Sequence, residues 1–354
     1  MRTSKIVAAA GFALAAGLAA APLSANAATT NVSSHFVDMY RLFNPYTTEH
    51  LYTSSASERD GLAKIGWHYE GVGWVAPSKV DADETFAEPV YRLYNPYTGD
   101  HHYTKSAGER DSLAKAGWRA EGIGWYSLVP TWDSPLKDDA RTIGVGVYRQ
   151  FNPYVQMGTH NYTTSKAEND AIVKLGWRAE GVAWEAVNAG STTNGTDASH
   201  KAALSHVKDT DQRSWEALAE GIGAVSPNQL ADNLVMANGI TVEDANWAVE
   251  HSGIDWKARS LKYVAKQLAR PEGRSEAYLR DLLKRGGYTS EVVDYAIANS
   301  RADWNAQAVK AVRDYRSYMG GITKDEARAY LTGEAGFTKA QADYAVAHAD
   351  ITWK

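Results

Sequence analysis

One pattern occurs three times in the first half of the chain, and it limits the possible folds more than any other feature. The stretch HLYTSSASERDGLAKIGWHYEGVGW begins at His50 and returns, with changes, at His101 and His160. The second copy aligns without gaps, and the third carries a two-residue insertion within NPYVQMGTH. Three copies spaced by roughly fifty residues define an internal repeat, so residues 35–187 are expected to form three equivalent units.

Each copy predicts the same order of short elements. A segment such as VYRLYN alternates apolar or aromatic residues with polar ones, NPYTGD is a turn, and HHYT begins a second strand. A serine then precedes a glutamate by three residues, which is the pattern of a capping box at a helix start. The pairs are Ser55 with Glu58, Ser106 with Glu109, and Ser165 with Glu168. The expected unit is therefore strand, turn, strand, short helix and strand.

One such unit is too small to bury its own apolar face, whereas three units could close a common core. We therefore expect a pseudo-threefold, trefoil-like, β-rich domain without a free sheet edge; a row of independent modules is the alternative. Two tryptophans recur in every copy, and core positions are favoured for them over a sugar-binding surface because large aromatic side chains are mostly buried. They are Trp67 and Trp74, Trp118 and Trp125, and Trp177 and Trp184.

The Asn-Pro-Tyr turns hold the better candidates for carbohydrate binding, because a turn tyrosine is expected to be exposed and can stack on a sugar ring. The candidate residues are Tyr46, His50, Tyr97, His101, Tyr154 and His160. The three histidines could instead converge on a metal ion, but a hydrogen bond across the turn is favoured, and no metal or cofactor is predicted.

Catalysis is not expected in this half of the chain. Glu70, Glu121 and Glu180 occupy equivalent places in the three copies. Glycoside hydrolysis needs two carboxyl groups in unlike environments, which three equivalent copies do not supply. The repeat therefore favours a scaffold or a multivalent binding surface, and the chain is predicted not to be an enzyme.

The repeated pattern resembles a known family. Its segments Y-R-x-[FY]-N-P-Y, H-x-Y-T and G-W-x-x-E-G-[VI]-[GA]-W are similar to a bacterial repeat family of unknown function. The resemblance covers all three copies. It implies a module appended to cell-wall lysozymes and other secreted proteins, and a role in binding wall polysaccharide or peptidoglycan. That role is an inference by association.

The second half of the chain changes to helical periodicity. Residues 188–198 are rich in Gly, Ser, Thr and Asn and are expected to form a flexible linker. Beyond them, segments such as SEAYLRDLLKRGG place apolar residues at helical spacing and stop at glycine. Thr241, Thr289 and Thr338 are expected N-caps. Residues 199–354 should form an all-α domain of three-helix repeats, the first of them diverged, which makes the chain an α+β multidomain protein.

The segments GGYTSEVVDYAIANSRADW and AGFTKAQADYAVAHADITW resemble the helix-turn-helix-like repeats of the host cell surface-exposed lipoprotein family, called Ltp. The resemblance is good from Trp256 to Trp353. Because some members are encoded by prophages, it implies a role in superinfection exclusion, in which injection of incoming phage DNA is blocked at the envelope. This chain lacks the family's lipidated cysteine, which weakens the expectation of a membrane anchor.

The helix-turn-helix shape does not favour DNA as the partner. Lys257, Arg259, Lys262 and Lys266 could follow phosphates, but such a face could equally contact an anionic wall polymer or a protein. The net charge of −5 and the pI near 6.1 disfavour a general nucleic-acid binder. Nucleic acid is therefore not an expected partner.

The first residues predict export. Arg2 and Lys5 precede an apolar run that ends before ANA, so residues 1–27 read as a signal peptide. No other segment is apolar enough to span a bilayer, and the chain has no cysteine for a disulfide. The expected location is secreted, either extracellular or non-covalently associated with the cell wall, without stable membrane insertion.

These features predict a secreted, cell-envelope-associated binding protein. Its N-terminal module would bind wall glycan, and its helical repeats would contact an envelope or protein partner. The first alternative is a surface protein of the superinfection-exclusion type that binds a phage protein. The second alternative is an accessory module of cell-wall hydrolysis.

Overall fold

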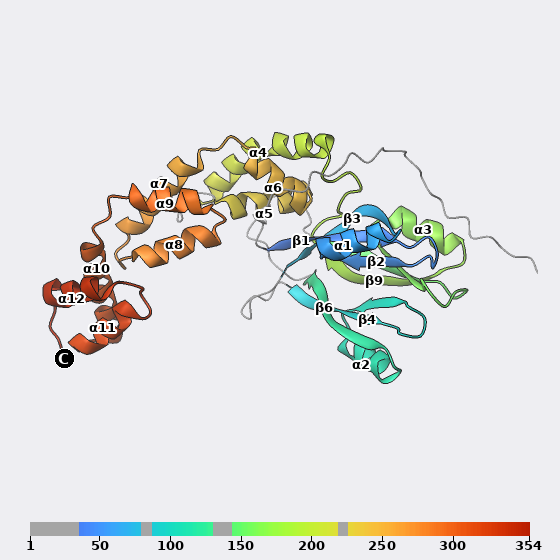
Figure 1. Ribbon diagram of the computed structural model, residues 1–354, viewed down its shortest axis with the longest axis horizontal. Helices are drawn as coiled ribbons and strands as arrows, with labels where there is room; N and C mark the ends of the chain where they lie inside the picture. The colour runs from blue at the N-terminus through green and yellow to red at the C-terminus, as the bar shows by residue number, and fades with distance from the viewer. Residues whose placement is uncertain (1–34, 79–86, 130–143, 219–225) are drawn as a thin grey trace, which may run out of the picture. The chain divides into compact units, whose positions relative to one another are not determined.

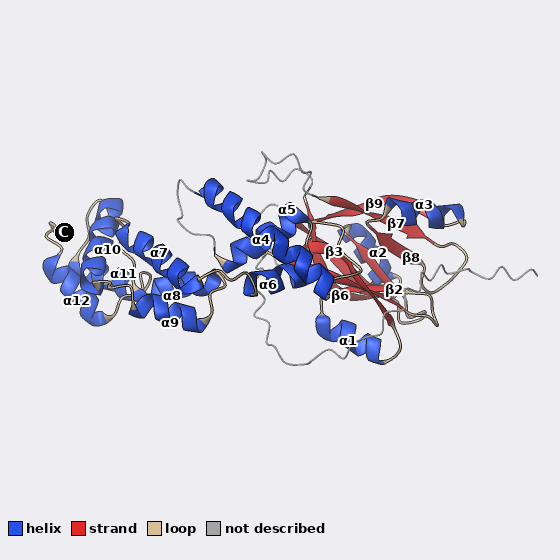
Figure 2. Cartoon of the chain, turned by 90° about the horizontal axis from the view of Figure 1, so that it is seen from above, coloured by secondary structure: helices blue, strands red, loops and turns tan. Residues whose placement is uncertain are grey.

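The protein is described by a computed structural model covering residues 35–78, 87–129, 144–218 and 226–354. Strands dominate the first part of the chain and helices the second (Figures 1 and 2). The predicted α+β multidomain class is confirmed. The predicted signal peptide, residues 1–27, lies outside the described residues.

Each repeat contains three antiparallel strands and one short helix, in the predicted order. The first repeat holds β1 (Phe36–Phe43), β2 (His50–Thr53), α1 (Ala56–Lys64) and β3 (His68–Pro77). The second holds β4 (Ala87–Tyr94), β5 (His101–Thr104), α2 (Ala107–Lys115) and β6 (Arg119–Leu128). The third holds β7 (Val145–Phe151), β8 (His160–Thr163), α3 (Lys166–Lys174) and β9 (Arg178–Ala186).

The strands form two sheets in the part of the chain that the structure describes. One has the order β2-β1-β3, and the other has the order β5-β4-β6-β9-β7-β8. Within the second sheet, β6 and β9 meet only through the pair of Leu128 with Glu185. The two sheets therefore end at β2, β3, β5 and β8, and the expectation of a sheet without free edges is wrong. Closure comes from side chains rather than from a continuous barrel of hydrogen bonds.

The core of the β domain is a stack of two aromatic triangles. Trp74, Trp125 and Trp184 are buried, with ring centroids 5.7, 5.7 and 5.4 Å apart. The predicted core position is thus confirmed for these three tryptophans. The other repeated tryptophans are only partly buried, and they are Trp67, Trp118 and Trp177.

The second triangle also links the three repeats by hydrogen bonds. Tyr52, Tyr103 and Tyr162 are buried, with ring centroids 5.5 to 5.8 Å apart. The hydroxyl of each tyrosine bonds the backbone of the equivalent tyrosine in the preceding repeat. It accepts a hydrogen bond from that residue's amide and donates one to its carbonyl. These bonds run around all three repeats, so each repeat completes the hydrogen bonding of the preceding one.

The repeat helices are capped differently from the prediction. Ser55 Oγ accepts from the amide of Glu58 at 3.2 Å, as expected. The amide of Ser55, however, donates to Thr53 Oγ1 at 3.0 Å and not to the glutamate. The same arrangement recurs at Ser106 and Ser165. The predicted capping box is therefore wrong, because a threonine takes the amide and leaves the glutamate carboxylate for another partner.

The predicted flexible linker at residues 188–198 also differs from the prediction. Asn188 and Ser191 form β-bridges with Val75 and Val72 of β3, and the next helix begins at Asp197. Gly, Ser and Asn suit a tight backbone approach as well as a flexible segment, so composition alone does not separate the two cases.

The remaining chain forms the predicted three-helix units. The first holds α4 (Asp197–Leu218), α5 (Pro227–Asn238) and α6 (Val242–Glu250), and the second holds α7 (Trp256–Ala269), α8 (Glu276–Arg285) and α9 (Ser290–Ala298). The third holds α10 (Trp304–Met319), α11 (Lys324–Thr332) and α12 (Lys339–His348). Thr241, Thr289 and Thr338 are N-caps, as predicted.

The first helical unit shares its apolar core with the β domain, whereas the other two have cores of their own. Phe36, Val72 and Val187 join the cluster that contains Leu230 and Leu234. A buried carboxylate adds a polar link, because Asp38 of β1 accepts from the first two amides of α6 at 2.8 and 2.9 Å. Burial raises the pKa of Asp38 to about 7 despite these two hydrogen bonds.

Candidate functional site

Three equivalent polar clusters lie where one repeat meets the next. Arg92 of β4 makes two hydrogen bonds, at 2.8 and 2.9 Å, to Glu58 of the preceding repeat. Arg41 binds Glu168 in the same way at 2.8 and 3.0 Å. The third junction pairs Arg149 with Glu109 at 3.3 and 3.4 Å. The ion pairs thus connect the first repeat to the second, the second to the third, and the third back to the first.

Each cluster is completed by the histidine and the second glutamate of the arginine's own repeat. In the first cluster, Arg41 Nε lies 2.9 Å from Glu70, and His50 Nε2 lies 3.3 Å from the same carboxylate. Equivalent contacts join Arg92 to Glu121 at 2.8 Å and Arg149 to Glu180 at 2.8 Å. Because the histidines are mostly buried in these contacts, their faces are not arranged as a surface for sugar stacking.

Sequence reasoning missed these arginines as members of a cluster. Arg41, Arg92 and Arg149 were expected only as the polar side of an alternating strand. The available signal was their exact recurrence beside the apolar core positions in all three copies. An arginine at such a position needs a carboxylate partner, and the helix-start glutamate of the neighbouring repeat supplies it.

One of the three junctions opens into a cavity of about 410 Å³. It lies between the second and third repeats, and its lining includes His102, Glu109, Trp118, Phe151 and His160. The position of His102 is occupied by Leu51 in the first repeat and by Asn161 in the third. This cavity is therefore chemically distinct from the other two junctions. Burial, with the nearby charges of His102 and Arg149, lowers the pKa of His160 to about 3.

The cavity also brings two carboxylates together, which is a feature that could serve hydrolysis. Glu109 and Glu180 both line it and both contact Arg149. The hydrogen bond from His102, with the one from Thr104 Oγ1, holds the pKa of Glu109 far below its usual value. A general acid needs a raised pKa, so Glu109 is poorly suited to that role.

The turn tyrosines are the most exposed candidates of the β domain. Tyr46, Tyr97 and Tyr154 are 87%, 83% and 76% exposed. Each turn is fixed from within, because an asparagine side chain accepts from the tyrosine amide at 2.9 to 3.0 Å. The structure therefore places the tyrosines on the surface and the candidate histidines, His50, His101 and His160, inside the junctions.

The helical units repeat an aromatic side chain on the third helix. Tyr295 of α9 and Tyr344 of α12 are 37% and 40% exposed, and Trp247 holds the corresponding place in α6. Trp247 stacks against His200 and His251, with centroids 4.3 and 3.9 Å away. Each helical unit therefore presents one partly exposed aromatic side chain at the same position of its third helix.

The predicted basic face is only partly available to a polymer. Lys257 Nζ lies 2.6 Å from Glu291, and Arg259 makes an ion pair with Asp211 at 2.7 Å. Lys262 and Lys266 are exposed on α7, one turn apart. The four residues therefore do not form one continuous row of uncompensated charge.

No group of three or more His, Cys, Asp or Glu side chains is placed to hold a metal ion in the part of the chain that the structure describes. Among the same residues, no helix is both long and apolar enough to cross a membrane.

The fold and its junctions define a two-part class of protein: a β-rich domain closed by repeat-to-repeat ion pairs, followed by a series of three-helix units. Comparison with known families finds one match within each part. Residues 38–187 match a family described as a domain of unknown function (DUF5648). Residues 303–349, within α10 to α12, match the family described as host cell surface-exposed lipoprotein. Both predicted resemblances are confirmed at this level.

One solved structure is similar in sequence to part of the chain. It is that of Ltp, described as a superinfection exclusion protein from the Streptococcus thermophilus temperate phage TP-J34. The two are 31% identical over 27% of this chain and 96% of the other, with a TM-score of 0.25. No curated protein matches the chain.

Proposed function

We propose that the chain is a surface or secreted protein of the superinfection-exclusion type, which acts by binding and not by catalysis. The observation that carries the proposal is the match of residues 303–349 to the host cell surface-exposed lipoprotein family. In this proposal the helical units contact a phage or envelope protein and interfere with phage DNA entry.

The repeated aromatics of the helical units are the side chains that best suit such a contact. Tyr295 and Tyr344 leave more than a third of their surface exposed while their helices remain anchored in the unit cores. Aromatic residues of this kind dominate the energetics of protein interfaces. Lys257 Nζ lies 5.4 Å from the ring centroid of Tyr295, so a positive charge stands beside this aromatic side chain.

The experiment compares phage infection of the bacterium that encodes the chain with infection of the same strain lacking the gene. With the full chain present, plaque counts for a susceptible phage should fall, phage adsorption should be unchanged, and entry of labelled phage DNA should be reduced. The double substitution Tyr295→Ala with Tyr344→Ala should restore plaques. Tyr318→Ala is the matched control, because Tyr318 is 88% exposed but is not part of the repeated position.

A phage panel that infects both strains equally, with the chain detected outside the cell, would contradict the proposal. If Tyr318→Ala restores plaques as strongly as the double substitution, Tyr295 and Tyr344 are not the contact residues.

For the β domain we propose retention at the envelope through wall glycan, which the exposure of the turn tyrosines supports. The triple substitution of Tyr46, Tyr97 and Tyr154 by alanine should abolish sedimentation with purified cell walls while leaving the melting temperature nearly unchanged. Glu70→Gln is the control inside a junction. Unchanged sedimentation of the triple variant would contradict glycan binding by these turns.

A further inference from the structure

The ion pair at the junction between the second and third repeats is looser than the other two. Arg149 lies 3.3 and 3.4 Å from the two carboxylate oxygens of Glu109, whereas the equivalent distances at the other junctions are 2.8 to 3.0 Å. Glu109 also contacts His102, whose Nε2 lies 3.1 Å from Glu109 Oε1. The cavity of about 410 Å³ opens at this same junction, beside the looser pair.

The two-residue insertion of the third repeat forms one wall of this cavity, through Gln156 and Thr159. Asp100 of the second repeat holds the wall in place. Its carboxylate accepts from the amides of Gly158 and Thr159 at 3.1 and 3.4 Å, and from the hydroxyl of Thr159. Gly158 packs against the first repeat, since a Cβ atom added there would lie 2.7 Å from the carbonyl oxygen of Thr48. The wall is therefore fixed by contacts with both other repeats, and the cavity is preformed.

The cavity lies at one end of the strands that surround it. Near it, β4 and β6 pair through Tyr94 with Arg119, and β7 and β9 pair through Phe151 with Arg178. The ranges outside the described residues, 79–86 and 130–143, continue the chain from the opposite ends of these strands. The walls of the cavity are thus built from described residues.

The charges of the lining favour an uncharged ligand. Three carboxyl groups line the cavity together with one guanidinium, that of Arg149. Arg149 Nε lies 2.8 Å from Glu180, so the positive charge is placed between Glu180 and Glu109. The carboxylates oppose an anion, and the guanidinium opposes a cation at the same place. Trp118 and Phe151 add apolar surface to this polar lining.

One hydroxyl in the lining makes no hydrogen bond to the described part of the chain. The Oγ1 atom of Thr98 is buried and has no partner there. Thr47, its equivalent in the first repeat, accepts from the amide of Glu49 at 3.4 Å through the same atom. A buried hydroxyl without a partner is costly, so a ligand that bonds Thr98 gains from it. A ligand hydroxyl suits both Thr98 and a carboxylate, because it can donate and accept.

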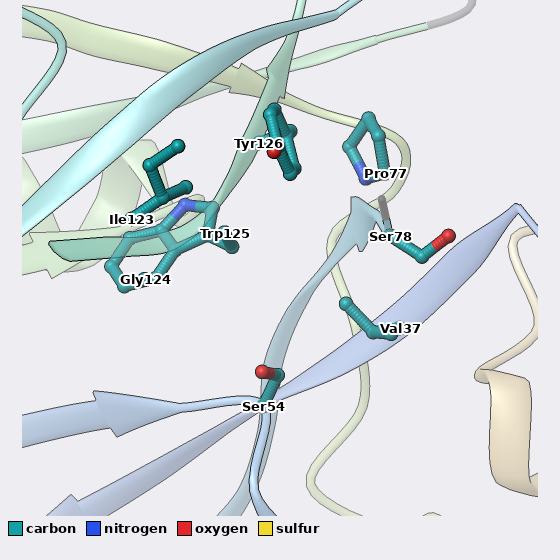
Figure 3. A pocket seen from close by; sticks show the side chains of 8 residues that line it. All are labelled: Val37, Ser54, Pro77, Ser78, Ile123, Gly124, Trp125 and Tyr126. Atoms are coloured by element: carbon teal, nitrogen blue, oxygen red, sulfur yellow. The ribbon is translucent and has the colours of Figure 1, made fainter. Parts of the chain in front are cut away.

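A second cavity, of about 270 Å³, has a different character (Figure 3). The described residues that line it carry no charged side chain, and they include Val37, Pro77 and Ile123. Small-molecule sites usually enclose roughly 300–1,000 Å³, a range that includes the first cavity and not the second. The second cavity therefore serves as a reference in the experiment.

We propose that the cavity between the second and third repeats binds one uncharged pyranose residue of a glycan. The apolar face of the sugar ring packs on Trp118, and its hydroxyl groups bond Thr98 Oγ1 and the carboxylate of Glu180. The inference rests on the glycan binding proposed for the β domain, and it adds an enclosed site to the exposed turn tyrosines. It also specifies the ligand, because the same lining disfavours sugar acids and amino sugars with a free amine.

The probes are four free sugars, each added to the full chain and followed by saturation-transfer difference NMR. Glucose and N-acetylglucosamine are uncharged, glucosamine carries a protonated amine, and glucuronic acid carries a carboxylate. We expect at least one uncharged sugar to bind, and both charged sugars to bind at least about tenfold more weakly than the tighter of the uncharged pair. Binding of none of the four, or tighter binding of a charged sugar, would overturn the proposal.

Two pairs of variants locate the site. Gln156→Trp should fill the cavity and weaken binding at least about tenfold, whereas Ser54→Trp, in the lining of the second cavity, should leave it unchanged. Thr98→Val removes only the hydroxyl and should weaken binding about three- to tenfold, with Thr47→Val as its matched control. If Gln156→Trp does not fold, the threonine pair decides. Equal effects within a pair would show that the cavity is not the site.

The same measurements separate this inference from retention at the wall. If the chain sediments with cell walls but binds neither uncharged sugar, the turn tyrosines remain the glycan site and the cavity assignment is wrong. If an uncharged sugar binds and Gln156→Trp abolishes that binding, the cavity assignment holds even where the chain does not sediment, and only retention at the wall is contradicted.

Discussion

The β domain and the helical units repeat a motif three times each, but they use repetition in opposite ways. In the β domain the third repeat returns to the first, because Arg41 binds Glu168 across that junction. The helical units instead form an open series, in which one unit contacts the next through a few residues such as Gln307, which bonds the main chain of the second unit. A closed arrangement should unfold as one body, whereas an open series should allow single units to unfold.

The largest test of this contrast removes one member of the tryptophan triangle. Trp184→Ala should cost about 3–5 kcal/mol, because a large buried side chain leaves a cavity that three repeats share. Hydrogen exchange should then show loss of protection in all three repeats together. Tyr154→Ala, at an exposed turn position, should change stability by less than about 0.5 kcal/mol. Loss of protection in the third repeat alone would contradict the closed arrangement.

The corresponding substitution in the series should act locally. Leu331→Ala removes a fully buried side chain from the core of α10 to α12 and should destabilise that unit by about 2–4 kcal/mol. Amide exchange should rise there while α7 to α9 stay protected. Leu283→Ala, in the core of the second unit, should give the reverse pattern. If either variant exposes both units equally, the units fold cooperatively and the contrast with the β domain fails.

The two regions also differ in how much of them the sequence predicts. Helix boundaries follow from local signals, and Thr241, Thr289 and Thr338 cap their helices as expected. The order of strands and helices in each repeat is likewise local. What was missed depends on contacts between repeats: the partner of Glu58 lies 34 residues away, and no helix-start pattern indicates which arginine it binds.

The incorrect linker prediction has the same origin. Residues 188–191 look flexible by composition, but their backbone groups pair with a strand more than a hundred residues earlier. Gly190 fits there because it has no side chain, a requirement that only the packed structure reveals. Local sequence patterns thus predict the helices and strands within a repeat well, but they predict the contacts between repeats poorly.

The junction ion pairs offer a smaller test of closure. Arg92→Ala leaves Glu58 and Glu121 partly buried without their partner and should cost about 1–3 kcal/mol. Arg328→Ala in α11 removes an arginine from two carboxylates on the surface and should cost less than about 1 kcal/mol. A double-mutant cycle between Arg92 and Glu58, measured by urea unfolding, checks the difference. Equal costs at the two arginines would mean that the junction pairs do not hold the repeats together.

The smallest effect concerns pH, and it is expected for His160 in the junction between the second and third repeats. His160 has a folded pKa of about 3, below its usual value of 6.5, so between these values the unfolded chain binds a proton that the folded chain does not. The contribution of His160 to stability should therefore fall as pH drops below 6.5, by about 1 kcal/mol between pH 7.5 and 5.5. The charged and titratable groups around it are His102, Glu109, Arg149, Arg178 and Glu180.

The substitution His160→Gln isolates that contribution, because it removes the proton-binding group and leaves the surrounding charges in place. Unfolding free energies of both proteins at pH 7.5 and 5.5 give the comparison. Asp38, whose folded pKa is raised to about 7, opposes the trend, because its contribution to stability is present at low pH and is lost as pH rises through that value. It acts equally in both proteins and cancels in the difference. Relative to the parent, the variant should gain about 1 kcal/mol of stability between pH 7.5 and 5.5. Parallel pH profiles would show that the cavity lets His160 take up its proton in the folded chain.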